Sequence, residues 1–167
     1  MFQIGDKVVY GVHGVCCVVD REERLIDRKS VLYLVLEPVG QGGARFFVPT
    51  HNAVAMAKVK KMLSREELEA MISSDAVLTD NWIADENLRK QTYRELISSG
   101  DREKLMQMVH TLYAHKAAQA ASGKKCHLCD DNFLRDAEKL LIGEIAVVLE
   151  TDEGEARNYL RLRLNRI

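Results

Sequence analysis

Two cysteines separated by two residues are the most conspicuous candidates for chemistry in this sequence. They are Cys126 and Cys129, within KKCHLCDD at 124–131. This spacing can supply half of a zinc ligand set or a thioredoxin-like dithiol. Zinc needs two more ligands, and such a dithiol usually follows a strand of a βαβ unit, whereas this pair follows a predicted helix. The remaining interpretation is a helix start capped by Asp130 or Asp131. We favour the capped helix, with no metal or cofactor, and keep a zinc or thiol-redox switch at Cys126 and Cys129 as the alternative.

The five histidines do not form a catalytic or zinc-binding pattern. His110 and His115 are five residues apart on one predicted helix and so point to different faces, whereas a zinc-protease pair is one residue closer. The glycines at 40–43 belong to a predicted hairpin turn and lack the helix that must follow a phosphate-binding loop. The sequence therefore predicts a protein that is not an enzyme and has no small-molecule substrate.

Trp82 is the only tryptophan and lies at the start of a helix predicted to run through residue 98. Arg89 follows seven residues later, hence on the same helix face, and Lys90 and Arg94 add positive charge. An apolar wedge beside cations is typical of proteins that enter the minor groove or a DNA fork. A lone tryptophan is more often a core or interface residue, which is the competing interpretation. The surrounding cations favour a DNA contact.

The elements that must position these residues divide the chain in two. The first 60 residues contain short β-branched and aromatic runs separated by glycine turns, predicted as strands at 8–10, 15–19, 31–36 and 45–48. So few short strands favour a small SH3- or Tudor-like β barrel. From Ser64 onward the apolar period becomes helical, with predicted N-caps at Ser64, Asp80 or Asn81, Asp101, Asp130 or Asp131, and Asp152. The predicted fold class is α+β: a barrel over 1–60, then an all-α helical domain over 61–167.

Composition limits the classes of partner. The chain is 47% hydrophobic and 29% charged with a net charge of -1, so it lacks the overall positive charge of a protein that binds DNA by its global field. Residues 1–62 hold nine Lys/Arg and six Asp/Glu, which leaves the rest of the chain net negative. Any DNA contact in the second part must therefore be a local patch. The apolar runs are only a few residues long, so we expect no signal peptide, no membrane association and a cytoplasmic location.

Several short motifs, taken in order, resemble those of one protein family. The N-terminal ones are IGDKVVY at 4–10, HGV at 13–15, YLVL at 33–36 and FVP at 47–49; the C-terminal ones are NW at 81–82, SGD at 99–101 and AEKLL at 137–141 with Glu144. Together they resemble the CarD/CdnL family of bacterial transcription regulators. That family shares its N-terminal module with the RNA-polymerase-interacting domain of the transcription-repair coupling factor.

The resemblance implies a function, and the residue pattern of the chain supplies two sets of candidate contact residues. The Tudor-like module would bind the β subunit of RNA polymerase, and the helical domain would contact promoter DNA at the upstream edge of the transcription bubble, with Trp82 as a wedge that prolongs the open complex. The expected DNA-binding residues are Trp82, Arg89, Lys90, Arg94, Lys124 and Lys125. The expected polymerase-binding residues are Arg24, Arg45, Phe46 and Phe47. A protein-only polymerase adaptor is the alternative.

Overall fold

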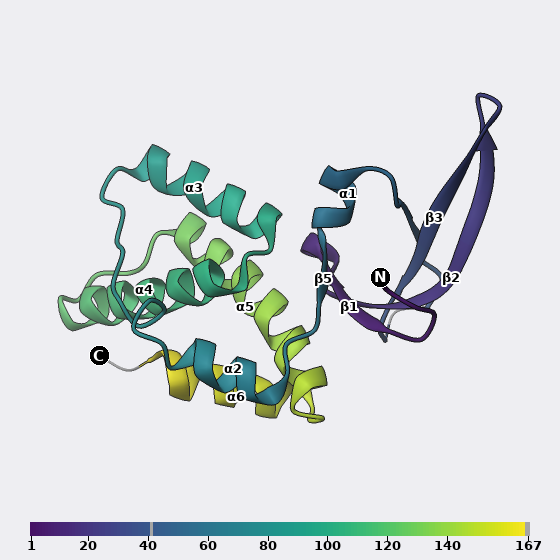
Figure 1. Ribbon diagram of the computed structural model, residues 1–167. Coiled ribbons are helices and arrows are strands. Elements are labelled where there is room, and N and C mark those ends of the chain that lie inside the picture. The colour runs from purple at the N-terminus through teal and green to yellow at the C-terminus, as the bar shows by residue number, and fades with distance from the viewer. Residues whose placement is uncertain (41, 166–167) are drawn as a thin grey trace. The chain divides into compact units, whose positions relative to one another are not determined.

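The chain forms two compact units, Met1–Met62 and Leu63–Ile167. The computed structural model describes residues 1–40 and 42–165 and is drawn in Figure 1. Gln41, within the turn predicted at 40–43, and residues 166–167, at the end of the predicted helical domain, lie outside the described residues. Across residues 1–40 and 42–165, no helix is long and apolar enough to cross a membrane.

The first unit is an antiparallel sheet with the strand order β4-β3-β2-β1-β5. Its elements are β1 (Lys7–Tyr10), the 3-10 helix η1 (Gly11–His13), β2 (Val15–Ile26), β3 (Lys29–Pro38), β4 (Phe46–Pro49), α1 (Ala53–Ala57) and β5 (Val59–Lys61). The α+β class is confirmed. The closed barrel is not, because no pairing joins the two edge strands, β4 and β5, within the described part of the chain. The short helix α1 contacts both edge strands at the place where a barrel would close.

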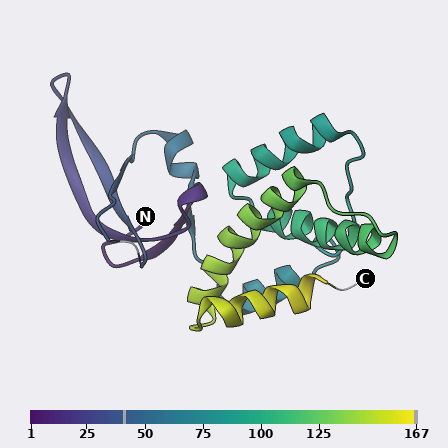
Figure 2. The same ribbon diagram turned by 180° about the vertical axis from the view of Figure 1, so that it is seen from behind.

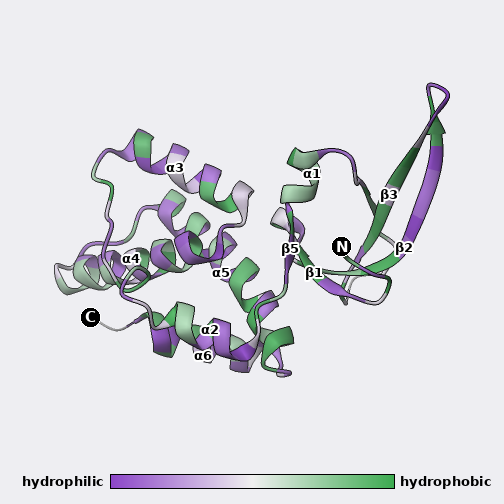
Figure 3. Ribbon diagram, viewed as in Figure 1, coloured by the Kyte–Doolittle hydropathy of each residue, from purple (hydrophilic) through white to green (hydrophobic). Residues whose placement is uncertain are grey.

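The β2–β3 hairpin is much longer than the sequence analysis expected. Its pairing runs from Cys16↔Pro38 to Ile26↔Lys29, with a shift in register between Val18 and Asp20. The predicted strands stopped at the charged run DREER, whose polar residues face solvent in the structure. Figure 3 shows this contrast, with the outer part of β2 mainly hydrophilic and β3 largely hydrophobic. The apolar core of the unit is formed by Val8, Cys16, Val18, Leu34, Leu36, Val48 and Val59.

The second unit is a bundle of helices: α2 (Arg65–Ile72), α3 (Glu86–Ser99), α4 (Arg102–Ala121), α5 (Leu128–Val148) and α6 (Glu153–Leu164). Three predicted N-caps are confirmed, since the side chains of Ser64, Asp101 and Asp152 each accept a hydrogen bond from the backbone N–H three residues later. Gly100 ends α3 with a φ of 67°, the left-handed conformation that glycine favours at this position.

Helix α5 lies at the centre of the bundle. It contacts α3, α4 and α6, and Figure 2 shows it from behind, passing between α3 and α6. Buried side chains from all five helices form one core, including Leu68, Tyr93, Leu112, Ile145 and Leu160.

Three hydrogen bonds close the bundle across long stretches of sequence. The buried carboxylate of Glu144 accepts a hydrogen bond from the backbone N–H of Leu63 at 3.1 Å, and pairs with the Nε of Arg102 at 2.6 Å. The Nδ1 of His110 donates to the carbonyl oxygen of Leu164 at 2.6 Å, because a carbonyl can only accept. The first and last parts of the helical unit are thereby tied to its centre.

Candidate nucleic-acid interface

Trp82 lies in the loop between α2 and α3, and not in a helix as predicted. The predicted cap Asp80 makes a local turn instead, accepting a hydrogen bond from the N–H of Trp82 at 3.1 Å. Asp85 is the actual N-cap of α3, with its side chain accepting from Leu88. Asn81 donates its backbone N–H to the hydroxyl of Thr111 on α4 at 3.0 Å, which anchors the loop to the bundle.

The indole of Trp82 is held between two planar groups. The imidazole of His115, on α4, stacks on it with ring centroids 3.4 Å apart and planes 11° apart. The guanidinium carbon of Arg89 lies 4.4 Å from the indole centroid. A ring stacked so closely fills one face of the indole, so the guanidinium must lie over the other. Trp82 is half-buried, and His115 and Arg89 together cover the two faces of its ring.

Arg89 does not face solvent, so its predicted contact with a DNA phosphate stays a prediction that its buried position disfavours. Its side chain is 3% exposed and forms a bidentate pair with Asp130, which is 1% exposed, at 2.9 Å and 3.1 Å. A third hydrogen bond joins Arg89 to the carbonyl oxygen of Ile83 at 3.0 Å. Burial alone lowers the pKa of Arg89, but the hydrogen bond and charge of Asp130 outweigh it and raise the pKa. The guanidinium is a permanent buried cation, and its hydrogen bond to Ile83 fixes the loop that carries Trp82.

The other expected DNA contacts remain on the surface. Lys90 pairs with Glu86 one turn earlier on α3 at 2.9 Å, and Arg94 is exposed one turn later on the same helix. Lys124 and Lys125 are exposed in the segment between α4 and α5. These four lysine and arginine residues stay predictions as phosphate contacts.

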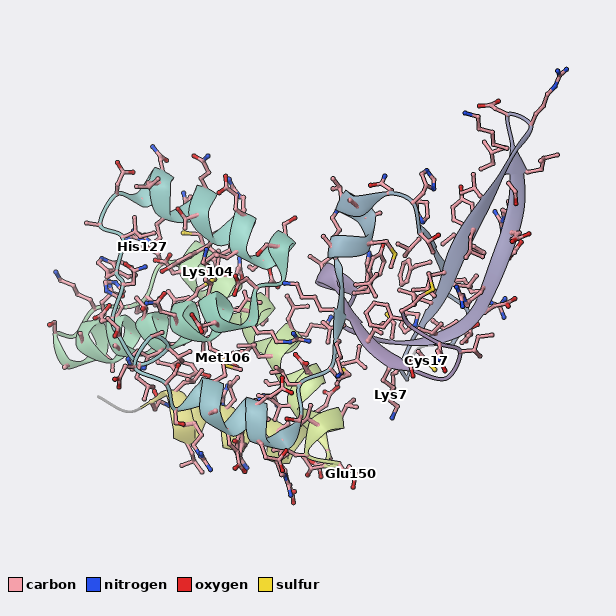
Figure 4. All side chains as sticks on the ribbon, viewed as in Figure 1. Lys7, Cys17, Lys104, Met106, His127 and Glu150 are labelled. Carbon is pink, nitrogen blue, oxygen red and sulfur yellow. The ribbon has the colours of Figure 1, made fainter. Side chains whose placement is uncertain are left out.

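The cysteine stretch begins α5, but its cap differs from the prediction. The N-cap is His127, labelled in Figure 4, which makes no side-chain capping bond. Asp130 is already inside the first turn, where its side chain is committed to Arg89. Cys126 and Cys129 are free thiols, and burial together with Asp131 and Asp130 raises the pKa of Cys126. Within residues 1–40 and 42–165, no three side chains of His, Cys, Asp or Glu are grouped to hold a metal ion.

The four expected polymerase contacts in the first unit do not all point to the same face of the sheet. Arg24 on β2 covers the ring of Phe47 on β4 at 4.3 Å and that of Tyr33 on β3 at 5.7 Å. Phe46 points to the opposite face of β4, packing against the core with His13 at a centroid distance of 4.2 Å. Arg45 forms a salt bridge with Glu37 at 2.8 Å. Arg24 and Phe47 therefore share one patch with Tyr33, Arg45, two residues before Phe47, is engaged by Glu37, and Phe46 lies on the opposite face.

Comparison with protein families accounts for most of the chain. Residues 2–60 match the family described as the CarD-like/TRCF RID domain, and residues 68–161 match the CarD C-terminal domain. The chain belongs to the CarD/CdnL family. Its two domains are those of a transcription regulator that interacts with RNA polymerase, in a family that is non-catalytic. The Arg24–Phe47 patch lies in the CarD-like/TRCF RID match, and the Trp82 loop lies in the CarD C-terminal match.

His115 and Asp130 are components of the Trp82 site of this CarD-family protein that the sequence analysis missed. The hydrogen-bonded partners Arg89 and Asp130 are 41 residues apart, and no local spacing signals such a contact. One available signal was the acidic pair Asp130 and Asp131 in KKCHLCDD, because a carboxylate can pair with one of the cations predicted on the segment of α3. It was interpreted as a cap, because Asp is a strong capping residue.

Proposed function

We propose that this CarD-family protein binds the β subunit of RNA polymerase through its first unit and stabilises the promoter open complex through its second. In this proposal Trp82 is the wedge at the upstream edge of the transcription bubble. The observation that carries it is the fixed indole on the loop between α2 and α3, held by His115 and Arg89 beside the cations of α3.

A preorganised indole suits a wedge. Proteins that kink or open DNA insert rigid apolar side chains between base steps, and contact of one aromatic side chain with a base contributes about 1–3 kcal/mol. Because Trp82 is already immobilised by its neighbours, it loses little conformational freedom on insertion. Lys90 and Arg94 on α3 would contact phosphates, which position a protein on DNA without reading the sequence.

The charge of the protein favours DNA contact only in the presence of polymerase. A net charge of -1 gives little attraction to free DNA. A second partner that holds the protein at the promoter raises the effective concentration of Trp82 at the fork. The coupling of two weak contacts through one chain is therefore part of the proposed mechanism.

The patch of Arg24, Tyr33 and Phe47 is the proposed polymerase-binding surface. Arginine and aromatic side chains dominate protein interfaces, and this arginine is already oriented by its contacts with both rings and by a 3.0 Å pair with Glu22. The patch adjoins β4, an edge strand that can accept a strand of the partner. The side-chain contact through the patch and the backbone contact through β4 would then be made at the same edge of the sheet.

The test separates the two contacts by measuring each with its own variant. Trp82→Ala should shorten the open-complex lifetime about tenfold, as expected from losing roughly 1.4 kcal/mol of contact between the indole and the DNA, while binding to the isolated β subunit stays unchanged. Arg24→Ala should weaken β-subunit binding. A Trp82→Ala lifetime equal to that of the unmodified protein would remove the wedge role and favour the protein-only adaptor. Unimpaired β-subunit binding by Arg24→Ala would remove the proposed polymerase surface.

A further inference from the structure

The imidazole of His115 is the least anchored of the groups around the proposed wedge. Arg89 is fixed by two hydrogen bonds to Asp130 and one to the carbonyl oxygen of Ile83. His115 belongs to α4, a different element from both the Trp82 loop and α3, and meets the indole through a nearly parallel stack at 3.4 Å. His115 therefore determines whether the indole face not covered by Arg89 is open or closed.

We propose that His115 is a positioning residue for Trp82, clamping the indole against the Arg89 guanidinium so that the ring meets DNA by its edge. With both faces covered, a base cannot stack on the indole unless His115 leaves. The exposed part of the ring is then its rim, which must lead the insertion between base pairs. The DNA part of this inference rests on the proposed function, whereas the clamp is a property of the free protein.

The charges around His115 favour a neutral ring. Burial has the largest effect and lowers the pKa of His115 below its ordinary value of 6.5. The carboxylates of Asp130 on α5 and Asp80 on the loop raise this pKa, while the positive charges of Arg89 on α3 and His127 before α5 lower it. The net direction is downward. A neutral imidazole can stack on the indole without adding a second cation beside Arg89. Acidification to a pH below this lowered pKa would place an imidazolium there.

The single tryptophan makes the clamp directly measurable. All indole fluorescence comes from Trp82, and an imidazolium quenches indole more strongly than a neutral imidazole. The unmodified protein should show a fluorescence decrease with a midpoint below pH 6.5. His115→Phe should abolish this transition while keeping the high fluorescence anisotropy of a fixed indole. His115→Ala should abolish the transition and lower the anisotropy.

A neighbouring histidine supplies the matched control. His127 is exposed at the N-cap of α5 and makes no capping bond, so His127→Ala should retain both the transition and the anisotropy. Retention of the transition in His115→Phe, or its loss in His127→Ala, would overturn the assignment to His115. The transition is measured in folded, unmodified protein, so the test does not depend on the stability of His115→Ala.

Open-complex lifetime tests the consequence for DNA. His115→Phe should behave as the unmodified protein, and His115→Ala should shorten the lifetime severalfold, with no further effect when combined with Trp82→Ala. A longer lifetime in His115→Ala would mean that a base takes the vacated face, and would overturn edge-first insertion. A mobile indole in His115→Ala, together with an undiminished lifetime in Trp82→Ala, would support the clamp and refute the wedge function itself.

Discussion

Replacing Asp130 by alanine should destabilise the helical unit strongly. The substitution removes both carboxylate oxygens from Arg89, at 2.9 Å and 3.1 Å, and leaves a guanidinium that is only 3% exposed without its counter-charge. Breaking a buried ion pair in this way costs about 3–5 kcal/mol, because the surviving charge stays desolvated. That is a large part of the roughly 5–15 kcal/mol by which a domain is stable.

The adjacent residue provides a control within the same helix turn. Asp131 pairs with Lys116 at 3.1 Å, but these side chains are 34% and 53% exposed, so Asp131→Ala should cost no more than about 1 kcal/mol. Urea unfolding followed by far-UV circular dichroism reports mainly on α2 to α6 and gives both values. Equal losses for Asp130→Ala and Asp131→Ala would refute the reasoning.

A double variant separates the pair from its packing. Arg89→Met combined with Asp130→Leu removes both charges and fills the space with apolar atoms, which is often neutral in stability. We expect it to recover most of the stability lost in Asp130→Ala but not the fixed indole, since the guanidinium over Trp82 is gone. Failure of the double variant to recover stability would show that the charges themselves are required.

Two further predictions concern glycine and cysteine chemistry. Gly100→Ala should destabilise the helical unit by about 1 kcal/mol because φ there is 67°. Gly143→Ala should stabilise the unit by about 1 kcal/mol, because Gly143 lies inside α5 with open space for a Cβ. Changes of the same sign in the free energy of unfolding, measured in urea, would contradict this. Burial and the neighbouring Cys17 raise the pKa of Cys16 to about 11, so its alkylation in the folded protein should remain slow at neutral pH and accelerate as pH rises toward that value. Rapid alkylation at neutral pH, measured by peptide mass spectrometry, would contradict the buried thiol.

Local signals predicted part of the fold. The caps at Ser64, Asp101 and Asp152 follow from side chains that bond backbone three residues away, and such signals survive in a single sequence. The cap of α3 was misplaced because Asp80 and Asp85 are chemically equivalent candidates, and tertiary contacts such as Asn81 to Thr111 chose between them. The open sheet was missed because strand patterns do not reveal which edges pair.

The sequence predicted that Trp82 and Arg89 lie together in the candidate site, but not the residues that hold them. Trp82 could be singled out because it is unique and near cations. The distinction between Arg89, which is buried, and Arg94, which is exposed, depends on Asp130 arriving from another helix. The stack with His115 likewise joins residues 33 positions apart, for which spacing along one helix gives no indication.

The long-range ties of Glu144 and Leu164 have a consequence for biosynthesis. Residues 1–62 form a contiguous unit and can fold as soon as they leave the ribosome, whereas the backbone of Leu63 meets Glu144 only after 81 more residues have been translated. Until α6 emerges, the apolar surface covered by Ala156, Leu160 and Leu164 stays open to water and to proteases. The nascent protein would thus fold its polymerase-interacting unit first, whereas the core of the helical unit forms only after α6 has been translated.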